Sequence, residues 1–331
     1  MKNNRRLTID ISYKTILAVL FSFLAFQFIS NIISVIILLF TAILVVIAVN
    51  PLVNLLSKRN LPRPAASLLV LFVILTTLSL LIAMVITPLL SQTQVFLQRL
   101  PGLTEEILPF KLDFQSLSPQ LFSFRDQFFK LAASTFSGVL SILTVVVISF
   151  YLLQEWPNLK SYLKYLFGSR GELYHHIVLQ LESKLGSWVR GELLLMLIVG
   201  GLTYVGLGLL GLPYLLALSV IAGLLELVPN IGPTIAAVPA IIVGFSVSYS
   251  HGLAALIVAI IVQQLENHLI VPKVMQKATG LNPIITLIAL MIGFQLGGPL
   301  LAVLALPVFI TIEVFVSHLH LDKNKDLPQI S

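Results

Sequence analysis

The segment from Glu226 to Pro239, ELVPNIGPTIAAVP, interrupts an apolar run that extends from Leu215 to Phe245. It places a carboxylate, an amide, a glycine and helix-breaking prolines inside an otherwise hydrophobic stretch. In hydrocarbon every backbone N–H and C=O needs a partner, so such a break is tolerated only where it is buried in protein or lines a wet cavity. An ionisable group at that depth is by default a functional-site hypothesis. The segment therefore predicts a discontinuous membrane helix with a polar site at its break.

A second interrupted segment near the C-terminus resembles the first. Gly297-Gly298-Pro299 is followed by small and apolar residues that end at Pro307, as Gly232-Pro233 is followed by a similar run that ends at Pro239. Paired hydrophobic segments interrupted by glycine and proline are the best sequence indication of a transporter binding site. We therefore expect two broken helical hairpins, in 214–248 and in 281–318.

Composition assigns the chain to the all-α polytopic membrane proteins. Of its 331 residues 57% are hydrophobic and 10% are charged, whereas soluble domains carry roughly 25% charged residues. The net charge of +6 comes from basic residues in loops, as the positive-inside rule expects, and does not indicate a nucleic-acid partner. The absence of cysteine excludes disulfides and thiolate sites.

The hydrophobic pattern predicts about eight transmembrane helices, of about 20 apolar residues each. The stretch from Thr15 to Leu56 is too long for one span, so we expect two crossings with a bend near Gln27 to Ser34. The predicted order is spans one to three in 1–100, an extracytoplasmic amphipathic segment in 101–133, span four in 134–157, a cytoplasmic amphipathic helix pair in 158–190, a transport region in 191–318 and a cytoplasmic tail in 319–331. With both termini cytoplasmic, most of the 20 basic residues lie inside. The two broken hairpins then open from opposite sides.

The helix that runs from Gly252 to Val271 ends in the most polar membrane stretch of the chain. At 100° per residue Gln263, Glu266 and Asn267 share one face of this helix, with Gln264 beside them. Three further residues are predicted structural hinges, namely Pro272, Gly280 and Pro283.

Three motifs in this order resemble those of the AI-2E transporter family. They are Glu226 to Pro233, Gln263 to Met275, and Gly280 to Pro283. The resemblance implies a bacterial inner-membrane permease related to autoinducer-2 exporters of quorum sensing, with about eight helices and a homo-oligomeric state. It also implies export of a small polar solute, and some relatives act as sodium/proton antiporters. The sequence departs from the family at Glu226, where asparagine is often found, and at Asn230, where an aromatic residue is common; the first difference adds a titratable group.

We therefore expect a substrate or ion site near the membrane midplane, used by alternating access. Its members are Glu226, Pro229, Asn230, Gly232, Pro233, Gln263, Gln264, Glu266, Asn267, Gly297, Gly298 and Pro299. Glu226 and Glu266 would couple the binding of protons or sodium to transport, because buried ionisable groups are costly and usually functional. Structural alternatives remain open: Glu226 as an acceptor at a helix end, Glu266 paired with Lys273, and Glu313 as either a proton site or a packing residue.

Other functional classes have less support. The sequence has no HExxH or GxSxG motif and no thiol, so we expect no enzyme activity. It has no GxxxxGK[ST] loop for ATP, and we expect no cofactor or metal. The remaining rival is a membrane scaffold protein built on the helix pair at 158–190.

Overall fold

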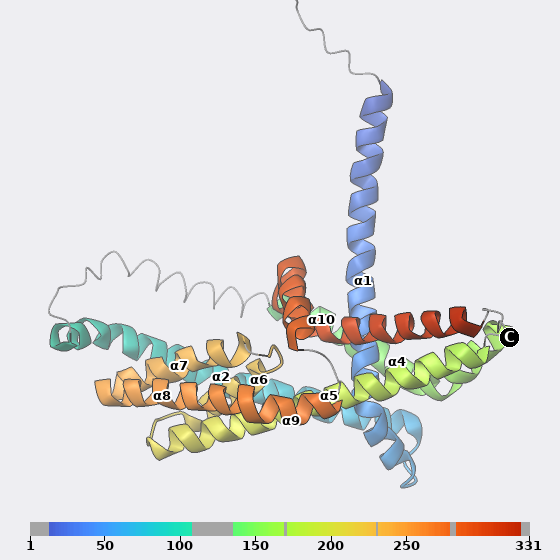
Figure 1. Cartoon of the computed structure of the whole chain (residues 1–331). Coiled ribbons are helices and arrows are strands. Elements are labelled where there is room, and N and C mark those ends of the chain that lie inside the picture. The colour runs from blue at the N-terminus through green and yellow to red at the C-terminus, as the bar shows by residue number, and fades with distance from the viewer. Residues whose placement is uncertain (1–12, 108–134, 169–170, 230, 279–282, 326–331) are drawn as a thin grey trace, which may run out of the picture.

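The computed structural model describes residues 13–107, 135–168, 171–229, 231–278 and 283–325, and every secondary-structure element in these ranges is a helix. The expected segment 101–133 lies outside the described residues from 108 onward, and so do Asn230, Gly280 and residues 326–331. In chain order the helices are α1 (Tyr13–Ser57), α2 (Arg63–Ile107), α4 (Thr135–Leu166), α5 (Gly171–Leu209), α6 (Leu215–Leu225), α7 (Ile231–Val247), α8 (Tyr249–Leu265), the π-helix η2 (Glu266–Ile270), α9 (Val271–Ala278) and α10 (Pro283–Lys325) (Figure 1).

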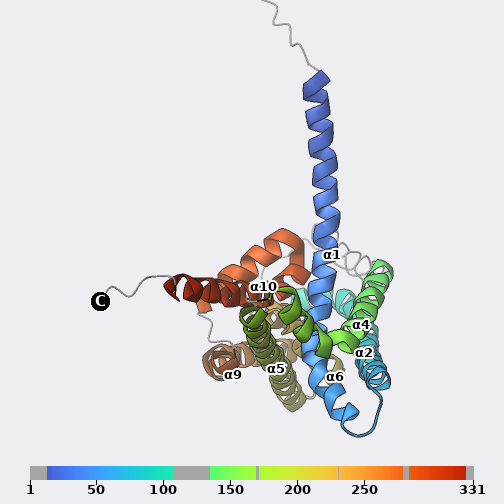
Figure 2. The same cartoon turned by 90° about the vertical axis from the view of Figure 1, so that its right-hand side faces the viewer.

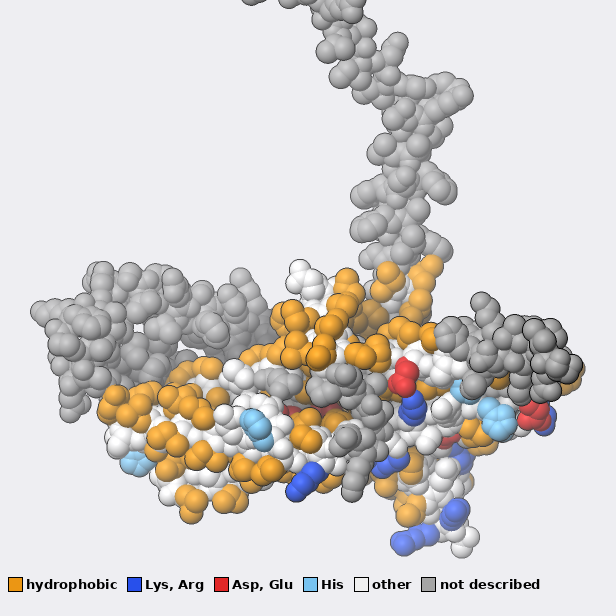
Figure 3. Space-filling view, viewed as in Figure 1, with side chains coloured by type: hydrophobic (Ala, Val, Ile, Leu, Met, Phe, Trp, Pro, Cys, Tyr) orange, Lys and Arg blue, Asp and Glu red, His pale blue; other side chains and the backbone are white. Residues whose placement is uncertain are grey.

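The chain is a multi-pass membrane protein. Six of the described helical stretches are long and apolar enough to cross a bilayer: Ile32–Ser57, Arg63–Val85, Leu140–Leu159, Gly171–Leu209, Tyr249–Met275 and Ile284–His318. Two further apolar helices, α6 and α7, have 11 and 17 residues, about 16 and 26 Å at 1.5 Å per residue. The hydrocarbon core is about 30 Å thick, so α6 is too short to cross it. The visible face is largely hydrophobic, with few charges (Figure 3). The expected number of eight crossings is not confirmed.

The expectation of two crossings before the first loop is wrong, because α1 is one continuous helix from Tyr13 to Ser57. The only proline within it is Pro51, and it contains no glycine. The polar residues at which we expected a bend cost little in a helix and supply no break. Figures 1 and 2 show α1 extending far beyond the other helices. The expected orientation relied on a hairpin here, so a cytoplasmic N-terminus stays a prediction without that support.

The amphipathic segment at 158–190 is continuous with membrane helices on both sides. Its first half is the end of α4 and its second half is the start of α5, and the two helices are separated by residues 167–170. At this turn the backbone of Gly171 lies so close to Lys164 that a Cβ would overlap the carbonyl of Lys164. The segment therefore extends α4 and α5 and is not a separate pair of helices.

Two hydrophobic cores organise the molecule. The first, which we call the scaffold core, joins α1, α2, α4, the first half of α5 and α10, and its buried members include Val53, Leu153, Trp188 and Ile310. The second, the hairpin core, joins the second half of α5 to α6, α7 and α8, through two small clusters around Val199 and Leu207. Among the described helices only α5 has buried residues in both cores, but α2 of the scaffold core also packs on α6 and α7, where Val85 contacts the cluster around Val199.

A polar network fixes the scaffold core near the turn between α1 and α2. Arg63, at the start of α2, donates three hydrogen bonds of 2.8–3.0 Å, to the Leu153 carbonyl and to the side chains of Asn54 and Asn50. Glu182 on α5 accepts hydrogen bonds from Asn50 at 3.4 Å and from Trp156 at 3.2 Å. This network links α1, α2, α4 and α5.

Candidate functional site

The predicted break at Glu226 is present. α6 ends at Leu225, α7 begins at Ile231, and Glu226 caps the C-terminus of α6 with its N–H bonded to the Ala222 carbonyl at 3.3 Å. Within the break, Ile231 donates to Pro229 and Gly232 to Val228, both at 2.8 Å. These bonds satisfy part of the backbone where the helix is interrupted, as burial away from water requires.

The glycine and prolines of the break are packed in protein. Pro229, Gly232 and Pro233 are all buried. A Cβ at Gly232 would overlap the carbonyl oxygen of Leu225, so the turn back from α6 into α7 has room only for glycine there. The residues that interrupt the helix therefore also allow its two arms to approach closely.

The polar stretch after α8 takes a different form from the predicted face. Gln263, half-buried, and Gln264, exposed, lie in the last turn of α8. The helix then changes to the π-helix η2, in which Glu266 is fully buried and Asn267 is exposed. Single π-turns within α-helices occur frequently at functional sites. The structure thus turns one carboxylate inward and does not bury the predicted group of four residues together.

Glu266 is joined by two other buried carboxylates. Glu192, Glu226 and Glu266 expose 2%, 0% and 0% of their surface. None of their six carboxyl oxygens has a hydrogen-bond partner among the described residues. Gln263 lies beside the Glu266 carboxyl, but without the geometry of a hydrogen bond. The side chain of Glu226 interacts electrostatically with both other carboxyls, and Glu192 with Glu266. We call these three residues the carboxyl cluster.

A close contact between α5 and α6 sets the separation of two cluster members. A Cβ at Gly223 would lie 2.7 Å from the Met196 carbonyl oxygen and 3.5 Å from the Gly200 Cα. Met196 is four residues after Glu192, and Gly223 is three residues before Glu226. The glycines therefore allow α6 to lie directly against α5 beside the cluster, as small residues do between membrane helices.

A cavity lies next to the carboxyl cluster, between α5, α6, α7 and α8. Its volume is about 30 Å³, and its lining is apolar except for Thr203. Ala222 and Val262, which contribute to the lining, precede Glu226 and Glu266 by four residues, or about one helical turn. Val199, also in the lining, follows Glu192 by seven residues, or two turns. The cluster thus lies at one end of an apolar chamber that has room for one or two water molecules.

The second break is present in α10. Gly297 is extended, with φ −164°, and Gly298 has φ +68°, in the left-handed region that glycine adopts without strain. α10 bends sharply there (Figure 1), and Gly297 and Pro299 are exposed. Its buried residues belong to the scaffold core, and α10 packs chiefly on α5. The structure shows no extensive packing of the described part of α10 on α6, α7 or α8. That both breaks form one site stays a prediction.

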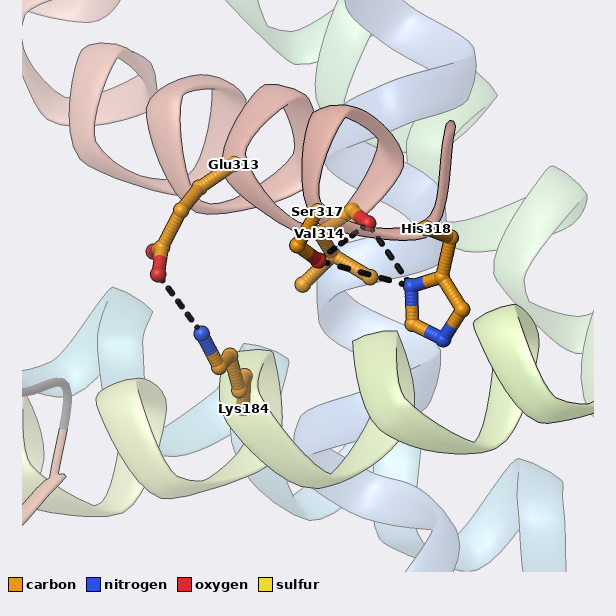
Figure 4. A network of polar contacts seen from close by, with 5 residues as sticks. All are labelled: Lys184, Glu313, Val314, Ser317 and His318. Atoms are coloured by element: carbon orange, nitrogen blue, oxygen red, sulfur yellow. Dashed lines mark hydrogen bonds and ion pairs between the residues drawn. The ribbon is translucent and has the colours of Figure 1, made fainter. Parts of the chain in front are cut away.

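Glu313 has the partner that the sequence left open. Lys184 on α5 donates to the Glu313 carboxylate on α10 at 2.9 Å (Figure 4), and both side chains are partly exposed. His318 and Ser317 hydrogen bond to the Val314 carbonyl one turn away on α10. Glu313 therefore joins α10 to α5 as part of the scaffold.

The remaining predicted residues lie away from the cluster. Pro272 is exposed at the start of α9, and Pro283 begins α10. Glu266 forms no ion pair with Lys273, which is exposed.

Glu192 was missed by the sequence analysis. It follows Arg190 and directly precedes the apolar run from Leu193, so it was placed at a polar boundary outside the span. Its position within one turn of buried Trp188 and Leu195 was the available signal.

The sequence is similar to those of several known proteins. Residues 15–320 match the family model described as AI-2E family transporter. The Bacillus subtilis protein named "Putative transport protein YueF" is 32% identical over 295 residues, which is 80% of this chain and 79% of that protein. Two other similar proteins also carry the name "Putative transport protein". YhhT of Escherichia coli K12 is 27% identical, over 82% of this chain and 81% of YhhT. The Synechocystis protein sll0063 is 28% identical, over 73% of this chain and 68% of sll0063. The names of these proteins mention transport, but they do not mention a solute.

Proposed function

Because this chain belongs to the AI-2E transporter family, we propose that it exports a small polar solute across the bacterial inner membrane, driven by exchange with protons. The permease role rests on the family and on the membrane helices. The direction, the solute and the coupling ion are our proposal. The observation that carries it is the burial of Glu226 and Glu266, without partners, at the interrupted ends of α6 and α8.

Interrupted helices suit this role because their ends leave polar backbone groups that can meet a solute or an ion. The break after α6 leaves such an end beside the cavity, and η2, which continues α8 without a gap, adds the buried Glu266 next to it. The cluster would supply hydrogen bonds to the solute, and the apolar chamber would exclude water from it. If a carboxyl group here binds either a proton or the solute, but not both at once, the movement of protons in one direction is coupled to the movement of the solute in the other.

Alternating access follows from the division into two cores. The scaffold core joins α1, α2, α4 and α10 to the first half of α5, where two hydrogen bonds to Glu182 and the Lys184–Glu313 ion pair add to the packing. The hairpin core is smaller and contains the cavity and the short helices α6 and α7. We propose that α6, α7 and α8 move against this scaffold. We assign α10, and with it the second break, to the scaffold because buried residues of α10 lie in the scaffold core.

A sodium/proton antiporter is the second candidate. A family resemblance suggests it, and the same carboxylates would serve. Within the described ranges no group of three or more His, Asp or Glu residues is arranged to hold a metal ion. A homo-oligomeric state, implied by the resemblance, also belongs to the proposal.

The test is transport in proteoliposomes loaded with autoinducer-2 as the probe, with an imposed pH gradient. We expect the gradient to accelerate loss of the probe through the wild-type protein. Glu226→Gln should remove the dependence on the gradient, because the amide cannot release a proton. The matched control is Glu172→Gln, an exposed carboxylate on α5 paired with Lys164. A gradient dependence that survives in Glu226→Gln would contradict coupling at this residue. Acceleration by a sodium gradient alone would favour the antiporter.

A further inference from the structure

We infer that Glu192 completes, with Glu226 and Glu266, a proton-binding site located at the junction between the scaffold and the moving unit. The role of this site in transport rests on the proposed function, whereas the binding of protons at the site does not. It assigns to α5 a site residue that the sequence patterns did not indicate.

The first step is the shared environment of the three carboxyls. They come from α5, from the α6–α7 break and from η2, and each is at least 98% buried. The charged groups that act on them are one another. In the part of the chain that the structure describes, no basic side chain forms an ion pair with any of the three, and the amide of Gln263 lies beside Glu266.

The second step is the cost of this arrangement if all three were ionised. Removing one unpaired carboxylate from water costs several kcal/mol, and like charges near one another add repulsion. Nothing in the described surroundings offsets three negative charges. The cluster therefore keeps most of its carboxyls neutral by holding protons, and it shares them because the groups interact. The ligand that this arrangement calls for is therefore the proton.

The third step is the place of Glu192 on α5. One turn before it, Trp188 belongs to the scaffold core, and two turns after it, Val199 belongs to the hairpin core. The first half of α5 is fixed by the hydrogen bonds to Glu182 and by the Lys184–Glu313 pair. Glu192 therefore stands on the fixed side, opposite carboxyls carried by the break and by η2. Movement of α6, α7 and α8 against α5 would change the distances within the cluster and release or bind protons.

The experiment needs no knowledge of the solute. Infrared difference spectroscopy of the purified full-length protein follows the carbonyl band of protonated carboxyl groups during a pH titration. In the wild type we expect such bands to persist at neutral pH, where exposed carboxylates such as Glu172 are ionised. Glu192→Gln should remove one component and change the titration of the remaining ones, since a coupled neighbour is lost. Glu172→Gln should change neither.

Two results would overturn the inference. One is a wild-type spectrum without protonated carboxyl bands at neutral pH, which needs no variant to fold. The other is a Glu192→Gln spectrum that loses its own component while the remaining carboxyls titrate as before, as expected for a merely structural residue. The proposed function fails separately: if the spectra show a coupled cluster but a pH gradient does not drive transport, the proton site stands and the coupling to solute falls.

Discussion

Gly223→Ala tests the contact that holds α6 against α5 beside the carboxyl cluster. The added Cβ would lie 2.7 Å from the Met196 carbonyl oxygen, about 0.7 Å short of the 3.4 Å at which ordinary contact begins. The obstacle is backbone on the facing helix, so α6 must move away. Overpacking of this kind costs about 1–3 kcal/mol.

The matched control for this substitution is Gly201→Ala on α5. A Cβ there meets no atom within 4 Å, and alanine favours a helix over glycine by about 1 kcal/mol. The stability of both variants is measured in detergent by thermal or denaturant unfolding. We expect Gly223→Ala to be less stable than the wild type, and Gly201→Ala to be as stable or more stable. Equal stability of Gly223→Ala and wild type would refute the close approach of α5 and α6. Because the displacement separates Glu226 from Glu192, transport by Gly223→Ala should fall as well.

Two further predictions concern the scaffold. Arg63→Lys keeps the charge but loses the planar group that donates to three acceptors. We expect the free energy of unfolding, measured with denaturant, to fall by about 1–3 kcal/mol. Unchanged stability would show that the hydrogen bonds of Arg63 add little. Lys184→Met removes a partly exposed ion pair with Glu313. We expect the free energy of unfolding to fall by less than about 1 kcal/mol, and the difference to disappear at high salt. A larger loss of stability that does not depend on salt would contradict the view of this pair as a weak contact between α5 and α10.

The sequence was most informative where backbone chemistry leaves few choices. Proline and glycine cannot continue a membrane helix without compensation, so Pro229, Gly232 and Pro233 predicted a break, and α6 and α7 are separate helices there. The same reasoning located the bend at Gly297 and Gly298. Both features depend on local conformation, which residue type largely determines.

The sequence was least informative where packing between distant segments decides. Helical periodicity grouped Gln263, Gln264, Glu266 and Asn267, but η2 shifts the register and only Glu266 is fully buried. Apart from its apolar neighbours Trp188 and Leu195, one turn away on either side, no local signal separates Glu192 from a boundary residue, because its burial comes from helices that are distant in the chain. The length of α1 was misjudged for another reason: the limit of about 20 residues for a span was applied to a helix that extends well beyond the bundle.

The shortness of α6 has a consequence for how the protein is made. An insertion machinery that selects segments by length and hydrophobicity has little reason to hold 11 residues across a bilayer. The polar backbone at Glu226 would also face lipid if α6 and α7 entered alone. The hairpin therefore becomes stable only when α5, made before it, and α8, made after it, are both in the membrane to enclose it. The biogenesis of this protein thus has an obligatory order, in which the carboxyl cluster is assembled after the helices that surround it.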